Sequence, residues 1–271
     1  MKDVKLLEHY ISTLKSEFSS SYVRNAHLYE VLPKNSQITQ NLSQKDLDAL
    51  HKFVKSNPMY ENSYESVYAD TQCIVYEGDM SSYWLDSIKH DTSYAPFYPT
   101  WILSAYALSK AAVKLGAKYA VDIGSGDGRI AYCTQMAGID TCSVEIDKNL
   151  ISLQKKICAK TNIHFDIKCD DATQIEYSEL DRVIFFIGGL PEVGEMLVRR
   201  VIEKTIHAIK PIYVLAGTLA PRKTSRDSTT YGWGQMMEEF GLVQLETLVL
   251  PTRWTVEQTE NTPYIFTVKK D

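Results

Sequence analysis

Several protein classes are excluded by what this sequence lacks. Its five cysteines are odd in number and include no Cys-x-x-Cys pair, which argues against a disulfide framework or a zinc ribbon. Its six histidines show no metal-ligand spacing, so we expect no metal site. The longest uncharged apolar stretches, 183–190 and 212–220, fall well short of the roughly 20 residues that span a bilayer. The N-terminal segment has no apolar signal core, and we therefore expect a cytoplasmic protein.

An excess of basic charge is also missing. The chain has 29 lysine and arginine residues against 34 aspartate and glutamate residues, a formal net charge of −5. Proteins that follow a nucleic-acid backbone usually carry a basic excess, so a protein or small-molecule partner is favoured over nucleic acid. The 271 residues, 44% of them hydrophobic, are enough for one large folded domain with an extension.

Residues 1–93 have a pattern of their own. Apolar residues recur there at helical spacing, and Ser43 with Asp46 three residues later resembles a capping box. One short strand is expected at 73–76. We therefore predict a mostly helical N-terminal extension over residues 1–93. Its first amphipathic helix presents Leu7, Ile11, Leu14 and Phe18.

From about residue 94, apolar runs typical of buried strands alternate with amphipathic helical stretches. This alternation predicts an α/β domain over residues 94–271, with a doubly wound, mainly parallel sheet and helices on both faces. A helix follows Thr100, which we expect to be its N-cap. Only a loop joins the last two strand-like segments, so an antiparallel pair is expected near the C-terminus. The predicted strands cover residues 119–123, 141–146, 163–169, 182–187, 212–219, 242–250 and 264–268.

The strongest motif is the segment Val121-Asp-Ile-Gly-Ser-Gly-Asp-Gly-Arg129. A strand runs into Gly124, Gly126 and Gly128 and then directly into a helix. Glycines allow the backbone to turn tightly and to approach a ligand, and a helix N-terminus offers unpaired N–H groups. An ordinary glycine-rich turn has the same appearance, so the loop needs further support.

Two carboxylates supply that support. Glu145 ends the next strand, 21 residues after Gly124, where a carboxylate can accept hydrogen bonds from both hydroxyls of a ribose. A nicotinamide dinucleotide fingerprint would read Gly-x-Gly-x-x-Gly, whereas here the third glycine comes one residue early. Asp122, two residues before the first glycine, suits a cationic ligand better than a pyrophosphate. The pattern therefore indicates a nucleoside ligand with a positive charge.

These residues resemble the first two motifs of the class I S-adenosylmethionine-dependent methyltransferases, and the element order matches over about residues 95–270. The resemblance implies a Rossmann-like sheet of seven strands and S-adenosyl-L-methionine as the cofactor. It also implies that Asp122 contacts the amino-acid end, that the glycine loop approaches the methionine and ribose, and that Glu145 holds the ribose. Asp171 would contact the adenine amine, although a solvated turn at Asp170 and Asp171 is the alternative. The expected cofactor-binding residues are Asp122, Gly124, Ser125, Gly126, Gly128, Glu145, Asp171 and Ala172.

The segments that flank this core look like those of the archaeal protein lysine methyltransferases, which are related to the non-SET histone lysine methyltransferases. They are Phe97-Tyr-Pro-Thr100, the glycine loop as far as Ile130, Val183-Ile-Phe-Phe and Glu195-Met-Leu197. The likeness implies that Tyr98 and Thr100 border the methyl-transfer pocket, and Tyr94 is a third candidate beside them. The chain departs from that compact family by about 90 additional N-terminal residues and a longer C-terminal part.

Two further segments bear on the methyl acceptor. Methyltransferases that act on base exocyclic amines resemble one another in an Asp/Asn-Pro-Pro-aromatic segment, and Ile187-Gly-Gly-Leu-Pro191 does not match it. Gly188 and Gly189 either present backbone carbonyls to the methyl group or form a plain turn. The basic segment 222–226 follows the fifth strand and reads more readily as a solvated loop than as a contact for an acidic substrate.

We therefore expect a methyltransferase that transfers a methyl group to a protein lysine amine. The alternatives are a small-molecule or RNA acceptor, or a binding module that keeps the cofactor without turnover. A partly desolvated pocket of Tyr94, Tyr98 and Trp101 would lower the pKa of a lysine amine. The N-terminal extension, which leads directly into these aromatics, is expected to cover the pocket as a lid.

Overall fold

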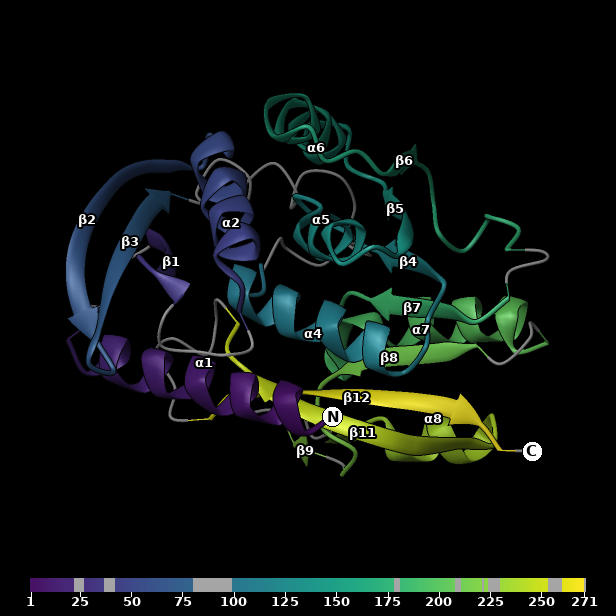
Figure 1. Ribbon diagram of the computed structural model, residues 1–271. Helices are drawn as coiled ribbons and strands as arrows, with labels where there is room; N and C mark the ends of the chain where they lie inside the picture. Colours follow the sequence, from purple (N-terminus) through teal and green to yellow (C-terminus); the bar gives the residue numbers. More distant parts are fainter. Residues whose placement is uncertain are drawn as a thin grey trace.

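The protein folds around one large sheet with a smaller sheet at its side (Figure 1). A computed structural model describes residues 1–21, 27–36, 42–79, 99–177, 181–207, 211–220, 222–223, 230–252 and 260–270. The boundary that we predict near residue 93 lies outside these residues. None of the described helices is long and apolar enough to cross a membrane.

The large sheet has seven strands in the order β11-β12-β8-β7-β4-β5-β6. The pairs from β8 to β6 are all parallel, whereas β12 runs antiparallel to both β8 and β11. The mainly parallel, seven-stranded sheet and its antiparallel strand near the C-terminus are therefore confirmed. Its strands are β4 (Tyr119–Ile123), β5 (Asp140–Glu145), β6 (Asp166–Cys169), β7 (Val183–Ile187), β8 (Ile212–Ala216), β11 (Leu242–Leu250) and β12 (Thr262–Lys269).

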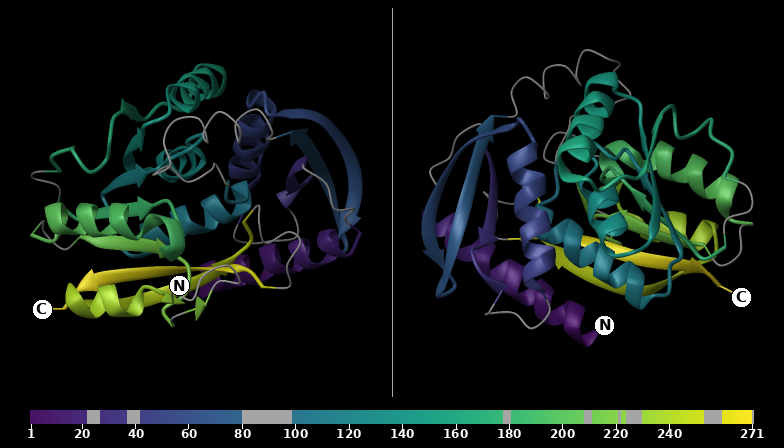
Figure 2. Two further views of the ribbon diagram at one scale, coloured as in Figure 1. Left: turned by 180° about the vertical axis from the view of Figure 1, so that it is seen from behind. Right: turned by 45° about the horizontal axis from the view of Figure 1, so that its top comes forward.

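Both faces of this sheet are covered, because the central strands are apolar on both sides. All residues of β7 are buried, and they alternate between two hydrophobic clusters: Phe185 belongs to the one with α7 and α8, and Phe186 to the one with α4, α5 and α6. Figures 1 and 2 show α4 and α5 on one face and α7 on the other. The helices are α4 (Ile102–Lys114), α5 (Arg129–Met136), α6 (Lys148–Thr161), α7 (Pro191–Thr205) and α8 (Gly234–Glu239).

The N-terminal extension is a mixture of helix and sheet, so the prediction of a mostly helical segment was incomplete. Two helices lie where the periodicity places them, but three strands form an antiparallel sheet in the order β1-β3-β2. Strand β2 was not predicted, because it is an edge strand whose residues are mostly exposed and show no apolar alternation. The elements are α1 (Lys2–Ser21), β1 (His27–Pro33), α2 (Gln44–Ser56), β2 (Tyr60–Tyr68) and β3 (Thr71–Asp79).

Helix α1 joins the extension to the large sheet. Its predicted apolar face is buried in the same cluster as α4. Its polar side chains contact the outer edge of β11: Glu8 accepts the Val249 N–H at 2.6 Å, and Lys5 donates to the Thr247 carbonyl. These contacts occupy the edge of the sheet, which would otherwise be open to pairing with another chain. The extension is thus part of the common core, and its role as a lid over the pocket stays a prediction.

Several element ends differ from those predicted. Helix α4 begins at Ile102 with Trp101 as its N-cap, and the Trp101 side chain makes no capping hydrogen bond. Thr100 was expected in that role, but its hydroxyl is bonded to Tyr264 and its backbone pairs with Thr252. The predicted cap of α2 is confirmed, since Ser43 accepts the backbone N–H of Asp46 at 3.1 Å. The basic segment after β8 contributes to a short pair, β9 (Arg222–Lys223) with β10 (Thr230–Tyr231).

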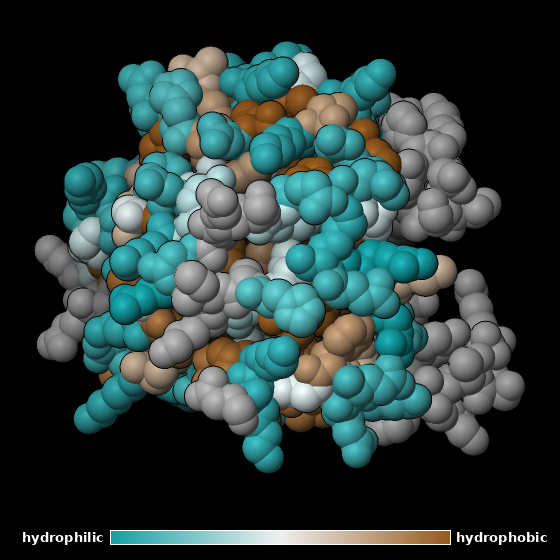
Figure 3. All heavy atoms as spheres, turned by 90° about the vertical axis from the view of Figure 1, so that its right-hand side faces the viewer, coloured by the Kyte–Doolittle hydropathy of each residue, from teal (hydrophilic) through white to brown (hydrophobic). Residues whose placement is uncertain are grey.

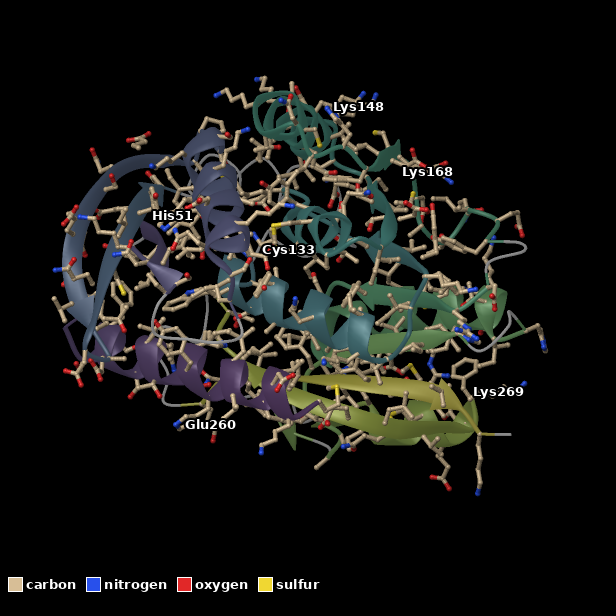
Figure 4. The ribbon with its side chains drawn as sticks, viewed as in Figure 1. His51, Cys133, Lys148, Lys168, Glu260 and Lys269 are labelled. Atoms are coloured by element: carbon tan, nitrogen blue, oxygen red, sulfur yellow. The ribbon has the colours of Figure 1, made fainter. Side chains whose placement is uncertain are left out.

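His51 fixes α2 against the small sheet, towards which it points in Figure 4. Its Nε2 lies 2.8 Å from the Pro33 carbonyl, and its Nδ1 lies 2.8 Å from the Tyr76 hydroxyl. A carbonyl only accepts, so Nε2 carries the proton and Nδ1 accepts from Tyr76. Burial lowers the pKa of His51; the nearby Lys55 lowers it further, while the hydrogen bond to Pro33 and the charge of Asp48 oppose the shift.

The lowered pKa of His51 predicts a loss of stability in acid. Because the folded state favours the neutral ring, the contribution of His51 to the free energy of unfolding is complete above the unfolded pKa of about 6.5. It is lost as the pH falls, at no more than about 1.4 kcal/mol per pH unit. Urea unfolding at several pH values should show a weaker dependence for His51→Gln than for the wild type. The exposed His9 provides the matched control, and equal pH dependence in all three proteins would contradict the assignment.

Candidate functional site

The glycine loop lies at the carboxyl end of β4, in the middle of the large sheet. Gly124, Gly126 and Gly128 have φ values of +65°, +59° and +77°, a left-handed conformation that side chains with a Cβ rarely adopt. The N–H groups of Gly124 and Ser125 both bond to the Val144 carbonyl of the neighbouring strand. The loop therefore turns sharply into the N-terminus of α5, as predicted.

Asp122 is buried at the end of β4. It is 3% exposed, and its Oδ2 accepts the backbone N–H of Ala131 at 3.0 Å. Burial raises the pKa of Asp122 to about 7; the Ala131 hydrogen bond opposes this shift, and the charges of Asp127 and Glu145 add to it. The carboxylate therefore changes its charge near neutral pH, and a cation beside it would stabilise the ionised form.

Glu145 lies at the end of the adjacent strand, β5. Its Oε2 accepts the N–H of Gly126 at 2.9 Å, and its Oε1 accepts those of Ile146 and Asp147 at 2.8 and 3.0 Å. Burial raises its pKa, and the three N–H groups oppose that shift. A carboxylate offers about four acceptor positions, so Oε2 keeps room for one more donor. The side chain is thus held rigidly against the glycine loop with acceptor capacity left.

A second brace of the loop comes from α6, and sequence reasoning missed it. Gln154 is fully buried, and its amide donates to the Ser125 hydroxyl at 2.9 Å and to the Gly126 carbonyl at 2.8 Å. Its Oε1 accepts the Ser143 hydroxyl at 2.6 Å. One signal was available: Gln154 is a polar residue within the inward apolar face of α6, where a buried amide needs partners.

The turn after β6 is ordered. Asp171 accepts the backbone N–H of Thr173 at 2.8 Å and its hydroxyl at 2.7 Å, both on Oδ1. Asp170 donates its N–H to the Glu145 carbonyl at 3.1 Å, which places the turn beside the end of β5. Ala172 is buried against the sheet. Among the contacts of the described residues Oδ2 of Asp171 has no partner, so an acceptor is available there.

A buried charge cluster adjoins the loop, and the sequence analysis did not predict it. The guanidinium of Arg129, 4% exposed, lies between Asp127 in the loop and Glu30 in β1. Its Nη2 and Nε donate to Asp127 at 2.6 and 2.9 Å, and its Nη1 donates to Glu30 at 2.5 Å. Arg129 also donates to the Thr100 carbonyl. One cation is thus shared by two carboxylates from distant parts of the chain.

The acceptor side of the site is only partly described. Tyr94 and Tyr98 lie outside the described residues, so their roles remain predictions. Thr100 is buried, with its hydroxyl bonded to Tyr264 and its carbonyl to Arg129. Trp101 is 1% exposed and packs edge-on against Phe18, with the ring centroids 6.0 Å apart. It belongs to the hydrophobic core, and a partly desolvated pocket formed with Tyr94 and Tyr98 stays a prediction.

The segment after β7 touches the glycine loop. Gly188 donates its N–H to the Ile123 carbonyl at 2.7 Å, and a Cβ on Gly188 would lie 3.0 Å from the carbonyl oxygens of Ile123 and Gly124. The close approach explains the glycine at position 188. Gly189 has φ +113° and abuts Gly194 in α7. The strand ends of β4, β5 and β7 therefore converge on one place.

The arrangement can hold a ligand that combines a cation with hydroxyl groups. Asp122 and Glu145 offer buried carboxylates on either side of a loop whose backbone approaches closely. Within the described part of the chain no group of three histidine, cysteine or acidic residues could hold a metal ion. Figure 3 draws the side of the molecule that lies on the right in Figure 1, and this side shows mostly hydrophilic side chains with scattered apolar areas.

No protein-family model and no curated protein matches the sequence. Some solved structures are similar to the chain at low identity. A magnesium protoporphyrin IX methyltransferase from Synechocystis, with bound S-adenosylhomocysteine, is 13% identical with a TM-score of 0.47, over 62% of this chain and 81% of that one. A putative RNA methyltransferase from Pyrococcus horikoshii is 15% identical with a TM-score of 0.46, over 70% and 97%.

TehB from Haemophilus influenzae is 16% identical with a TM-score of 0.43, over 74% of this chain and 71% of that one. Identities and TM-scores this low carry no conclusion about this chain. The function of this chain therefore has to be argued from its own residues.

Proposed function

We propose that the protein is an S-adenosylmethionine-dependent methyltransferase. The observation that carries the proposal is the convergence of Asp122, Glu145 and the left-handed glycine loop at the carboxyl ends of two central parallel strands. In open α/β sheets this edge, where the strand order reverses, is the place where ligands bind. The order β7-β4-β5 has that reversal at β4.

The residues present fit the proposed cofactor. Ionised Asp122 suits the cationic amino-acid end, and the acceptor position that remains on Glu145 suits a ribose hydroxyl. Gly124, Ser125, Gly126 and Gly128 form the turn that the methionine and ribose would approach. Oδ2 of Asp171 is proposed to accept a hydrogen bond from the adenine amine, and Ala172 is proposed to lie beside the adenine ring.

The proposed chemistry places modest demands on the protein. The bound cofactor supplies a methyl group on a positively charged sulfur, which is already a strong electrophile. The chain's own residues then have to orient a nucleophile in line with that group and exclude water. No dedicated base is needed when the nucleophile arrives neutral. Thr100, together with Tyr98 and Tyr94, is the proposed border of this acceptor site.

A protein lysine amine is the proposed acceptor. It is supported by the flanking segments that look like protein lysine methyltransferases, and by the absence from the sequence of an Asp/Asn-Pro-Pro-aromatic segment after β7. A small-molecule or RNA acceptor, or a module that binds the cofactor without turnover, are the alternatives. The catalytic alternatives differ in the molecule that receives the methyl group, and a non-catalytic module transfers none.

Calorimetry with S-adenosylhomocysteine tests the cofactor. Glu145→Ala removes hydrogen bonds to a charged group, which are worth about 2–3 kcal/mol, and should raise the dissociation constant roughly 30- to 150-fold. Glu203→Ala, an exposed site on α7, is the control and should bind normally. Binding of NADH with no binding of S-adenosylhomocysteine would contradict the proposal.

The pKa of Asp122 predicts a pH-dependent affinity. Because the ionised carboxylate is the form that attracts a cation, and its pKa is about 7, binding should be full above neutral pH and weaken as the pH falls. Between about pH 8 and pH 6 the dissociation constant for S-adenosylhomocysteine should rise about tenfold. Asp122→Asn should bind more weakly at pH 8 and lose this dependence. An equal dependence in Asp122→Asn would rule out Asp122 as its source.

The acceptor is tested by incubating the protein with a cell extract and methyl-labelled S-adenosylmethionine. Label on a protein band, with methyl-lysine after hydrolysis, is the expected result. Label in RNA or in a small molecule would replace the lysine proposal by one of its alternatives. Tight cofactor binding with no labelled product in any fraction would favour the non-catalytic module.

A further inference from the structure

The N-terminal extension contacts the glycine loop through a buried cation. Arg129 is the first residue of α5, directly after the loop, and Asp127 stands within the loop. Glu30 comes from β1, 99 residues earlier in the chain than Arg129. All three side chains are almost fully buried. The single positive charge of Arg129 therefore holds a residue of the loop and a residue of the extension at once.

Further contacts tie the same cluster to both parts. Asn57, the C-cap of α2, donates its side-chain amide to Asp127 at 3.0 Å. Tyr60, at the start of β2, donates its hydroxyl to Glu30 at 2.9 Å and accepts from Arg129 at 3.2 Å. Asp127 is thus held by the extension on one carboxylate oxygen and by Arg129 on both.

The cluster also reaches the segment before α4. Arg129 donates to the Thr100 carbonyl, and Glu30 accepts the backbone N–H of Ile102 at 2.8 Å. This N–H belongs to the first turn of α4, where no side chain of the helix itself serves as a cap. Glu30 therefore caps α4 from the extension, and the backbone at 100–102 is fixed by the same ions that fix the loop.

We propose that Glu30 is a positioning residue for the cofactor site. Through Arg129 it holds Asp127, and with it the backbone of Gly126 and Gly128, in the conformation that binds the cofactor. This inference rests on the proposed function. It assigns to the extension a part in cofactor affinity, in addition to the role as a lid that the sequence predicts.

The physical reason lies in the glycines. A loop with three glycines loses more conformational entropy on ordering than other segments do, so its binding conformation has to be enforced by contacts outside the loop. Gln154 provides such contacts from α6, and the Glu30–Arg129–Asp127 chain provides them from the other side. Loss of Glu30 leaves the buried Arg129 with Asp127 as its one carboxylate among the described residues. Arg129 is then no longer fixed between two carboxylates, and Asp127 is held less firmly through it.

Two variants and a control test this proposal. Glu30→Gln keeps the shape and removes the charge, and Tyr60→Phe removes only a hydroxyl that touches both ions. Glu65→Gln makes the same exchange at an exposed ion pair with Lys34 in the same small sheet, remote from the loop. The readouts are the dissociation constant for S-adenosylhomocysteine by calorimetry, and the hydrogen exchange of the peptide that covers residues 122–131.

Folded Glu30→Gln should raise the dissociation constant about tenfold or more and speed exchange of the loop amides. Tyr60→Phe should do both to a smaller degree, and Glu65→Gln should do neither. Wild-type affinity and wild-type exchange in folded Glu30→Gln and Tyr60→Phe would overturn the proposal, because a purely structural role lowers only the melting temperature. If Glu30→Gln does not fold, Tyr60→Phe decides alone.

The failure of the proposed function would look different. A wild-type protein that does not bind S-adenosylhomocysteine would refute the cofactor, whereas the exchange comparison needs no ligand. Faster exchange of the loop in the variants would then still support Glu30 as the residue that positions it, and unchanged exchange would refute that role independently.

Discussion

A buried guanidinium shared by two carboxylates is the constraint on which much of this structure depends. Arg129 cannot be left without partners in the interior, because removal of one partner of a buried ion pair typically costs about 3–5 kcal/mol. Its partners Glu30 and Asp127 come from the extension and from the glycine loop. The two parts must therefore fold together. The common hydrophobic cluster of α1 and α4 leads to the same conclusion from the apolar side.

The large sheet determines where the polar groups meet. Its central strands are buried on both faces, so the ends of the strands are the positions at which carboxylates can gather without disrupting the core. Asp122 and Glu145 end adjacent parallel strands, and Gly188 follows the strand on the other side of β4. The same topology that packs the core thus brings the candidate site residues together, and burial, with neighbouring charges, then shifts the pKa of Asp122 towards neutrality.

The sequence predicted the features that a contiguous run of residues encodes. The apolar runs at 183–187 and 212–216 and the glycine loop are contiguous, and each was located to within a few residues. Contacts between distant residues were not accessible: Glu30 belongs to no motif of the sequence, and only the fold brings Arg129 to it. Thr100 has the residue type of an N-cap, yet Tyr264 competes for its hydroxyl. Of the small sheet only the strand at 73–76, within β3, was predicted, and β2 was missed because it is exposed and lacks an apolar period.

The most direct measurement is a crystal structure of the protein with S-adenosylhomocysteine. The proposed binding mode places a ribose hydroxyl at hydrogen-bond distance, about 3 Å, from Oε2 of Glu145, and the amino group of the ligand beside Asp122. It also predicts that the Glu145 bonds to Ile146 and Asp147 persist, since they leave the required acceptor position open. A ligand bound away from the ends of β4 and β5, or one that leaves Glu145 without a new contact, would contradict it.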